Sequence, residues 1–182
     1  MRIDAATHLL EGADYIPSPN TDDRPHGADI DLLVIHSISL PPGEYGGNSI
    51  EQLFTNTLPA HGHPYFEQIH QLQVSAHVLI RRDGSLVQFV PFNKRAWHAG
   101  ESCYQGNERC NDFSIGIELE GTDTDLFESI QYEKLAELVN VLCHHYPAIT
   151  SQRIAGHSDI APGRKKDPGS GFDWEKLSSL LA

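Results

Sequence analysis

The stretch from Gly156 to Gly169, GHSDIAPGRKKDPG, concentrates ionisable side chains on one short segment. It carries one histidine, two aspartates, one arginine and two lysines among two prolines and three glycines. Because prolines and glycines interrupt regular structure, the segment is predicted to be a loop. Its His157 and Asp167, together with His36 from early in the chain, offer two imidazoles and a carboxylate. That set, with a fourth position left to water, is typical of catalytic zinc sites.

Spacing alone does not single out these three residues. The chain has 11 histidines, so two histidines and one aspartate can be chosen in many ways. His36 and His157 are also far apart in the sequence. On spacing alone, ordinary surface and core histidines are therefore favoured over a zinc site.

Two further residues have the chemistry that an amide hydrolase needs. An activated water requires a base that takes its proton and returns it to the leaving amine. It also requires positive charge where the carbonyl oxygen becomes negative. Glu118 and Lys165 are candidates for these two roles, and Lys165 lies two positions before Asp167. Each has an ordinary alternative, a solvated strand carboxylate for Glu118 and an exposed loop lysine for Lys165.

Buried strands are predicted to position the candidate residues. Residues 31–37, DLLVIHS, form a short apolar run that favours a strand buried on both faces and containing His36. Residues 113–119 alternate between apolar and polar, which indicates a second strand. Glu118 then lies on the polar side, beside Gly116, which leaves space above the sheet. A short strand at 153–155 is predicted just before His157.

Other patterns complete the predicted fold. Two β-rich runs within residues 76–90 flank Asp83-Gly84, which favours a hairpin with a two-residue turn. Helices are predicted at 49–54 and at 129–146, where apolar residues recur every three or four positions. A last helix begins near Asp173 and is expected to bury Trp174, Leu177 and Leu181. This mixture predicts an α/β (mixed α+β) fold with a single central mixed β-sheet packed by helices.

Composition limits the classes of partner. The chain has 182 residues and a formal net charge of −12, which argues against nucleic acid and anionic membranes as partners. Its length favours one domain, with residues 1–30 as an N-terminal surface arm. The sequence shows no signal-peptide core and no membrane-spanning stretch, so a cytoplasmic protein is expected. The three cysteines, Cys103, Cys110 and Cys143, are an odd number without a CxxC pair, which favours reduced thiols over a disulfide.

Four ordered segments resemble the AmpD family of N-acetylmuramoyl-L-alanine amidases. They are VIHSISLPPGEYGG, SAHVLIRRDGSLVQFVPFNKRAWHAG, CNDFSIGIELEGTD and GHSDIAPGRKKDPG, and the resemblance extends over residues 31–174. It implies the zinc amidase fold shared with phage amidases and peptidoglycan recognition proteins, with a zinc groove on one face of the sheet. It also implies hydrolysis of the amide between the lactyl group of 1,6-anhydro-N-acetylmuramic acid and L-alanine in muropeptides, during peptidoglycan recycling in the cytoplasm.

The resemblance implies a role for each candidate residue. It makes His36, His157 and Asp167 the Zn²⁺ ligands, Glu118 the catalytic acid and base, and Lys165 the residue that stabilises the oxyanion. Three further positions match substrate-binding positions of the family: Trp97, His98 and Arg109. For Trp97, packing in the core is the alternative.

Two positions depart from the family pattern. Ser37 stands where related enzymes often carry asparagine, and Gln73 where they often carry arginine. Both positions are expected to affect affinity for the peptide stem, and neither change alters a ligand or the catalytic pair. The expected partner is a small muropeptide bound by a monomer. In hosts that have an inducible chromosomal β-lactamase, the family's activity also implies removal of the inducing muropeptide.

Two alternatives to this function remain at the level of sequence. One is a muropeptide-binding sensor that has the fold without catalysis, although such a protein would be expected to lack a ligand residue. The other is an amidase acting on the intact cell wall, which would be expected to carry an export signal.

Overall fold

The computed structural model describes residues 1–181, and its centre is a six-stranded mixed sheet. In spatial order the strands are β1 (Asp14–Tyr15), β5 (Leu86–Gln88), β4 (Val78–Ile80), β9 (Ser114–Glu120), β3 (Leu32–Ile38) and β10 (Ile154–Gly156). β3 pairs in parallel with β9 and β10, and β9 pairs in parallel with β4. β5 pairs antiparallel with β4 and parallel with β1. The central mixed sheet is therefore as predicted.

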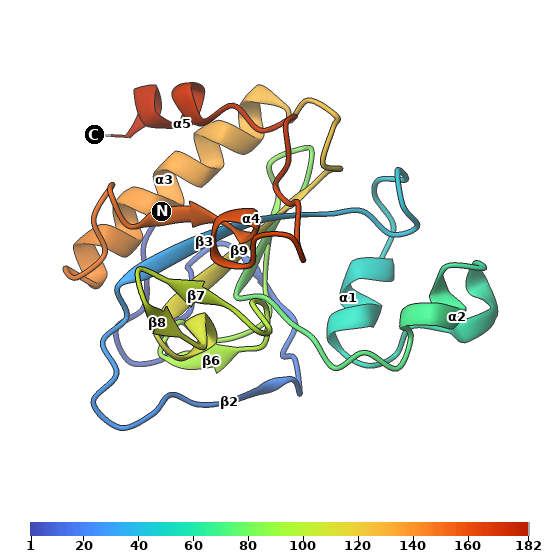
Figure 1. Cartoon of the computed structure of the whole chain (residues 1–182), viewed down its shortest axis with the longest axis horizontal. Coiled ribbons are helices and arrows are strands. Elements are labelled where there is room, and N and C mark those ends of the chain that lie inside the picture. Colours follow the sequence, from blue (N-terminus) through green and yellow to red (C-terminus); the bar gives the residue numbers. More distant parts are fainter. Residues whose placement is uncertain (182) are drawn as a thin grey trace.

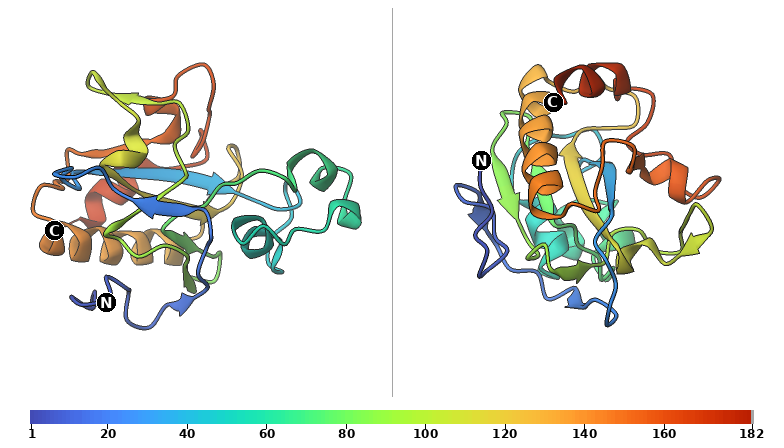
Figure 2. Two further views of the ribbon diagram at one scale, coloured as in Figure 1. Left: turned by 90° about the horizontal axis from the view of Figure 1, so that it is seen from below. Right: turned by 90° about the vertical axis from the view of Figure 1, so that its left-hand side faces the viewer.

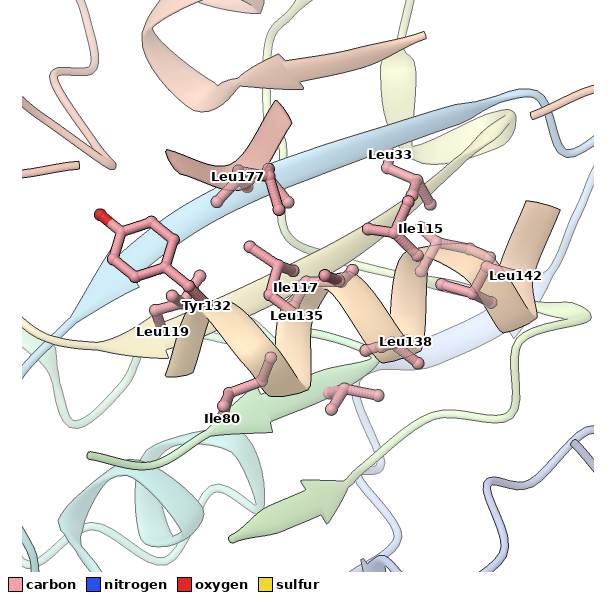
Figure 3. Close-up of a cluster of buried hydrophobic side chains, with 14 of the residues drawn as sticks. Leu33, Ile80, Ile115, Ile117, Leu119, Tyr132, Leu135, Leu138, Leu142 and Leu177 are labelled. Atoms are coloured by element: carbon pink, nitrogen blue, oxygen red, sulfur yellow. The ribbon is translucent and has the colours of Figure 1, made fainter. Parts of the chain in front are cut away.

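One face of the sheet is covered by two helices, α3 (Ser129–His145) and α5 (Trp174–Leu180) (Figure 2). The helical periodicity predicted α3 correctly, because Leu135 and Leu142 point onto Ile115 and Ile117 of β9 (Figure 3). Asp173 caps α5 by accepting a hydrogen bond from the backbone N–H of Lys176, at 2.9 Å. This face holds the larger hydrophobic core.

The opposite face of the sheet is covered by smaller elements. Near β3 lie α4 (His157–Ile160), a 3₁₀ helix (Cys110–Asp112) and the pair β7 (Cys103–Tyr104) and β8 (Asn107–Glu108). Toward β4 and β5 lie α1 (Ser49–Phe54) and α2 (Phe66–Ile69), which extend from the body of the molecule (Figure 1). The remaining elements are a 3₁₀ helix (Ala60–Gly62) and the antiparallel pair β2 (Thr21–Asp23) and β6 (Lys94–Ala96).

The hairpin between β4 and β5 has a longer turn than predicted. The backbone N–H of Gly84 donates to the carbonyl of Arg81, and the N–H of Arg81 donates to the carbonyl of Ser85. Only Gly84 of the Asp83-Gly84 pair has a positive φ, of 83°. A two-residue type I′ turn would need a positive φ at both residues, so the chain forms a three-residue loop with glycine in the left-handed position.

Three other expectations need correction. Residues 1–30 are more than a surface arm, since β1 extends the sheet and the side chain of Leu10 is 4% exposed within the main core. Trp174 is not buried, because it begins α5 on the outer side and is 39% exposed. The His157–Asp167 segment is not entirely loop, because its first residues form the single turn of α4.

Cys103, Cys110 and Cys143 are all unpaired. Within residues 1–181, no helix combines the length and the apolar character that crossing a bilayer would require.

One buried histidine, His77, predicts that the folded protein is sensitive to acid. His77 is 0% exposed, accepts from the backbone N–H of Gly116 and faces the carbonyl of Lys94. Burial, and then the charge of Arg24, lower the pKa of His77 to about 3. The unfolded chain, with an ordinary histidine pKa near 6.5, therefore binds the proton first, so stability is full above about pH 6.5 and falls as the pH drops toward 3.

We expect His77→Gln to weaken this pH dependence. In urea unfolding, the loss of unfolding free energy between pH 7 and pH 5 should be smaller in the variant by about 2 kcal/mol, because the amide does not titrate. If the unfolding free energies of the wild type and the variant fell equally between pH 7 and pH 5, His77 would not contribute to the pH dependence of stability.

Candidate active site

The site begins at two neighbouring parallel strands. His36 of β3 and Glu118 of β9 are partners in the strand register. Leu33 and Ile35 of β3 pack into the core under α3, so His36 points to the opposite face of the sheet. Glu118 shares that face, since residues paired across two strands lie on the same side. Both residues are near the carboxyl ends of their strands, where ligands bind in many α/β sheets.

The structure brings the three predicted metal ligands together. His157 follows directly after β10, the parallel neighbour of β3, and so reaches the same end of the sheet. The Nδ1 atoms of His36 and His157 are 2.9 Å apart, and each lies 3.0 Å from Oδ2 of Asp167. His36 and His157 are 1% and 2% exposed, respectively. These three residues form a group able to hold a metal ion.

Contacts at the base of the loop hold Asp167 in place. The backbone N–H of Ser158 donates to the carbonyl of Asp167 at 2.9 Å. Gly169 has a φ of 82°, and a Cβ at this position would lie only 2.1 Å from the carbonyl oxygen of Asp123. Glycine is therefore required for the two backbone segments to approach this closely.

The outer nitrogen of each imidazole also has a partner. Nε2 of His36 lies 2.9 Å from Nδ1 of His98, and Nε2 of His157 lies 3.1 Å from the carbonyl oxygen of Ala99. Such contacts orient a metal-binding histidine and determine which nitrogen carries its proton. Both Nδ1 atoms therefore face Asp167.

The environment shifts the pKa values of His36, Asp167 and Glu118. Burial lowers the pKa of His36 to about 4, although the hydrogen bond with Asp167 opposes this shift. Burial alone would raise the pKa of Asp167, but the contacts with His157 and His36 outweigh it and lower that pKa. The pKa of Glu118 is well above its usual value, because of burial and then the charge of Asp167, with Lys165 partly offsetting both.

Glu118 is set apart from the other buried carboxylates by its missing partner. Its Oε2 atom is buried and has no hydrogen-bond partner among the described residues. By contrast, Glu120 on the same strand is paired with Arg81 and accepts from the backbone N–H of Gly46. The ordinary alternative for Glu118, a solvated carboxylate, is thus inconsistent with its 8% exposure. A carboxylate kept buried and unpaired is typical of functional sites.

A cavity of about 590 Å³ opens over these residues. Lys165 and Trp97 are among the residues that line it. His98 also lines it, but both of its ring nitrogens are engaged, by His36 and by the Ser114 hydroxyl. Arg109 lies elsewhere, at a neighbouring hollow, where it pairs with Asp112 and its side chain is 75% exposed.

The two departures from the family pattern differ in position. Ser37 lines the cavity, and its hydroxyl donates to the Asp123 carboxylate at 3.3 Å. Gln73 is exposed and is not among the lining residues, although its neighbours Leu72 and Val74 are.

Sequence patterns missed most of the cavity wall. One side is apolar and comes from the segment around α1 and α2, and the other is polar and comes from the loop after β9. The only signal in the sequence was that large apolar residues occur in a segment rich in proline and polar residues. Leu72 is one of these apolar residues, and it is 47% exposed in the structure. The missed residues include Leu40, Tyr65, Ile69, Leu72, Val74, Thr122, Asp123 and Thr124.

Comparisons with known proteins agree with this arrangement. The sequence pattern of the N-acetylmuramoyl-L-alanine amidase family matches residues 26–170. The 1,6-anhydro-N-acetylmuramyl-L-alanine amidase AmpD of Citrobacter freundii is 58% identical over 172 residues, which are 94% of this chain and 91% of that protein.

Two solved structures are similar over most of the chain. A crystal structure of a Se-Met AmpD derivative superposes with a TM-score of 0.96 at 55% identity, covering 100% of both chains. The Escherichia coli amidase AmiD, in complex with anhydro-N-acetylmuramic acid-L-Ala-D-γ-Glu-L-Lys, has a TM-score of 0.61 at 30% identity. That match covers 86% of this chain and 60% of AmiD. The chain therefore belongs to the N-acetylmuramoyl-L-alanine amidase family.

Proposed function

We propose that this chain is a zinc-dependent amidase that cleaves 1,6-anhydro-N-acetylmuramyl peptides between the lactyl group and L-alanine. One observation carries the proposal: the side chains of His36, His157 and Asp167 converge beside the buried, unpaired carboxylate of Glu118. Relatives named for this activity are similar to the chain over nearly its whole length.

The residues that converge fit a zinc ion. Zinc bound tetrahedrally to nitrogen and oxygen, with bonds of about 2.1 Å, separates its ligand atoms by roughly 3.4 Å. The three atoms lie 2.9–3.0 Å apart, so each pair needs to separate by only a few tenths of an ångström. Two imidazoles and one carboxylate are also a known catalytic zinc set with a position left open. His36, His157 and Asp167 are therefore the residues that would hold the ion.

The chain's own residues would perform the proton transfers. Zinc, when bound, supplies a Lewis acid that polarises the substrate carbonyl and lowers the pKa of water. Glu118 takes a proton from the attacking water and passes it to the amide nitrogen as the C–N bond breaks. Its raised pKa suits both halves of that task, since the group must accept a proton and then release it. Lys165 provides positive charge for the oxygen that becomes negative.

The cavity suits a small amphiphilic substrate. Its apolar wall can cover the faces of a sugar ring, and its polar wall offers side chains to peptide groups. Trp97 is half-buried at the cavity, with its ring nitrogen donating to Asp22 at 3.2 Å, which leaves the indole face as a platform. We assign Trp97 to substrate binding.

Cleavage of a defined muropeptide tests the proposed function. The zinc-loaded protein should convert 1,6-anhydro-N-acetylmuramyl-tripeptide into the free anhydro sugar and a tripeptide beginning with L-alanine, as detected by mass spectrometry. A muropeptide with a reduced sugar end is the comparison substrate and should react more slowly. Binding of the anhydromuropeptide without any cleavage would contradict the proposal and would favour a sensor.

A further inference from the structure

The outer nitrogens of both candidate metal ligands are contacted by two consecutive residues. His98 presents Nδ1 to Nε2 of His36 at 2.9 Å, and Ala99 presents its carbonyl oxygen to Nε2 of His157 at 3.1 Å. The dipeptide His98-Ala99 therefore lies behind both imidazoles. Its contacts determine where the proton sits on each ring.

The direction of each hydrogen bond around His98 can be assigned by starting from the Ser114 hydroxyl, which contacts Nε2 of His98. The carbonyl oxygen of Cys110 can only accept, so the Ser114 hydroxyl donates to it, at 2.6 Å. With its proton used, Ser114 Oγ must accept from Nε2–H of His98, at 3.1 Å. Both partners of His98 are uncharged groups in an enclosed position, which favours a neutral ring. Nδ1 of His98 is then unprotonated and accepts from Nε2–H of His36.

The contact at His157 has the same consequence. The Ala99 carbonyl is an acceptor only, so Nε2 of His157 must carry the proton. The guanidinium of Arg164 donates to the same carbonyl at 2.6 Å and holds it in place. Nδ1 of each ligand imidazole is thus left with a free lone pair, and both lone pairs face Asp167.

Two further residues fix the dipeptide. The side-chain oxygen of Asn111 accepts from the backbone N–H groups of His98 and Ala99, at 3.1 and 2.8 Å. Gly116 makes space for the His98 ring, since a Cβ at that position would lie 2.4 Å from Cγ of His98. The space that the sequence predicted beside Glu118 is therefore occupied by His98 and is not open to substrate.

We propose that His98-Ala99 is a positioning unit that holds His36 and His157 in the one tautomer able to bind a metal ion through Nδ1. The inference rests on the proposed function, because it concerns the ligands of the proposed zinc ion. It makes His98 a positioning residue with no nitrogen free for the substrate. If the unit were lost, each ligand ring would have to be converted from its other tautomer before binding, which would weaken metal affinity.

Two substitutions of His98 separate positioning from packing. His98→Asn places a carbonyl oxygen where Nδ1 was, so it can still accept from His36 although it leaves a cavity. His98→Leu fills more of the space but cannot accept. Zinc affinity is measured at pH 7 by competition with a chromogenic chelator. We expect the leucine variant to bind zinc about 10–100-fold more weakly than the wild type and the asparagine variant to lie within a few-fold of it. The reverse order, or equal losses, would overturn the inference.

Ser114→Ala provides a test with little change in shape. Removal of the hydroxyl allows His98 to adopt the tautomer that cannot accept from His36, so zinc affinity should fall by about 10-fold. In the zinc-loaded wild type, two-bond ¹H–¹⁵N spectra should show His98 protonated at Nε2 and not at Nδ1. Protonation of His98 at Nδ1, or an unchanged zinc affinity in Ser114→Ala, would contradict the assigned hydrogen-bond directions.

The wild-type measurement separates this inference from the proposed function. A wild-type chain that takes up no zinc would contradict the zinc amidase itself. A wild-type chain that binds zinc, with no difference between the asparagine and leucine variants of His98, would contradict the positioning role alone.

Discussion

Glu118→Gln should lower kcat by roughly 10²–10⁴-fold, the range for loss of a general acid–base group. The amide keeps the size of the side chain but can neither take the proton from water nor return it to the amine. Glu118 supplies none of the three converging ligand atoms, which come from His36, His157 and Asp167. The variant should therefore keep its zinc. The measurements are kcat with an anhydromuropeptide and the zinc content of the same preparation.

Glu120→Gln is the matched control for that experiment. Glu120 is also buried on β9, on the same side of the strand, but its carboxylate is paired with Arg81. Its substitution should reduce stability while kcat stays close to that of the wild type. Loss of zinc from Glu118→Gln would instead make Glu118 a ligand, and an unchanged kcat would remove it from the mechanism.

Lys165→Met should lower kcat by roughly 10²–10³-fold, as expected when one oxyanion contact is lost. The methionine retains the length of the side chain without its charge. The substitution should also alter the pH profile, because Lys165 lowers the pKa of Glu118. Without the lysine that pKa rises, so the acid limb of kcat/KM should move to higher pH. Full pH profiles of both proteins provide the measurement.

Lys166→Met is the control for charge alone. Lys166 is the next residue, is exposed and is not among the residues that line the cavity. Its loss changes the net charge equally and should leave kcat and the acid limb unchanged. If both lysine variants lost activity to the same extent, the effect would reflect the overall field of the loop and not a contact by Lys165.

Local patterns predicted the elements that hold the site. Alternation identified β9 and placed Glu118 on its polar side, and helical periodicity identified α3. These two predictions succeeded because a strand or helix that buries one face repeats apolar residues with a fixed period along the sequence. The convergence of His36 with His157, 121 positions apart, has no such local signal. It follows from β10 pairing in parallel with β3. The family resemblance implied that the two histidines share a site, and spacing alone did not.

Local patterns could not predict features that depend on tertiary packing. The prediction that Trp174 is buried was wrong, because a pattern of apolar residues does not reveal which side of a short helix faces the core. The assignment of Arg109 to substrate binding came from the family resemblance, and no local pattern indicates that Arg109 pairs with Asp112 at a separate hollow. The cavity wall around α2 was missed because Tyr65 and Leu72 are exposed on an irregular segment without periodicity. Each of these depends on tertiary packing.

Zinc stoichiometry in the wild type and in Asp167→Ala tests the central claim most directly. Asp123→Ala is the control, because Asp123 lines the same cavity but lies outside the group of converging ligand atoms. After zinc loading and removal of free metal, the wild type and the control should each hold about one zinc per chain, as expected for one three-ligand site, and Asp167→Ala should hold much less. A wild type without zinc, or an Asp167→Ala variant that retains a full complement, would contradict the account.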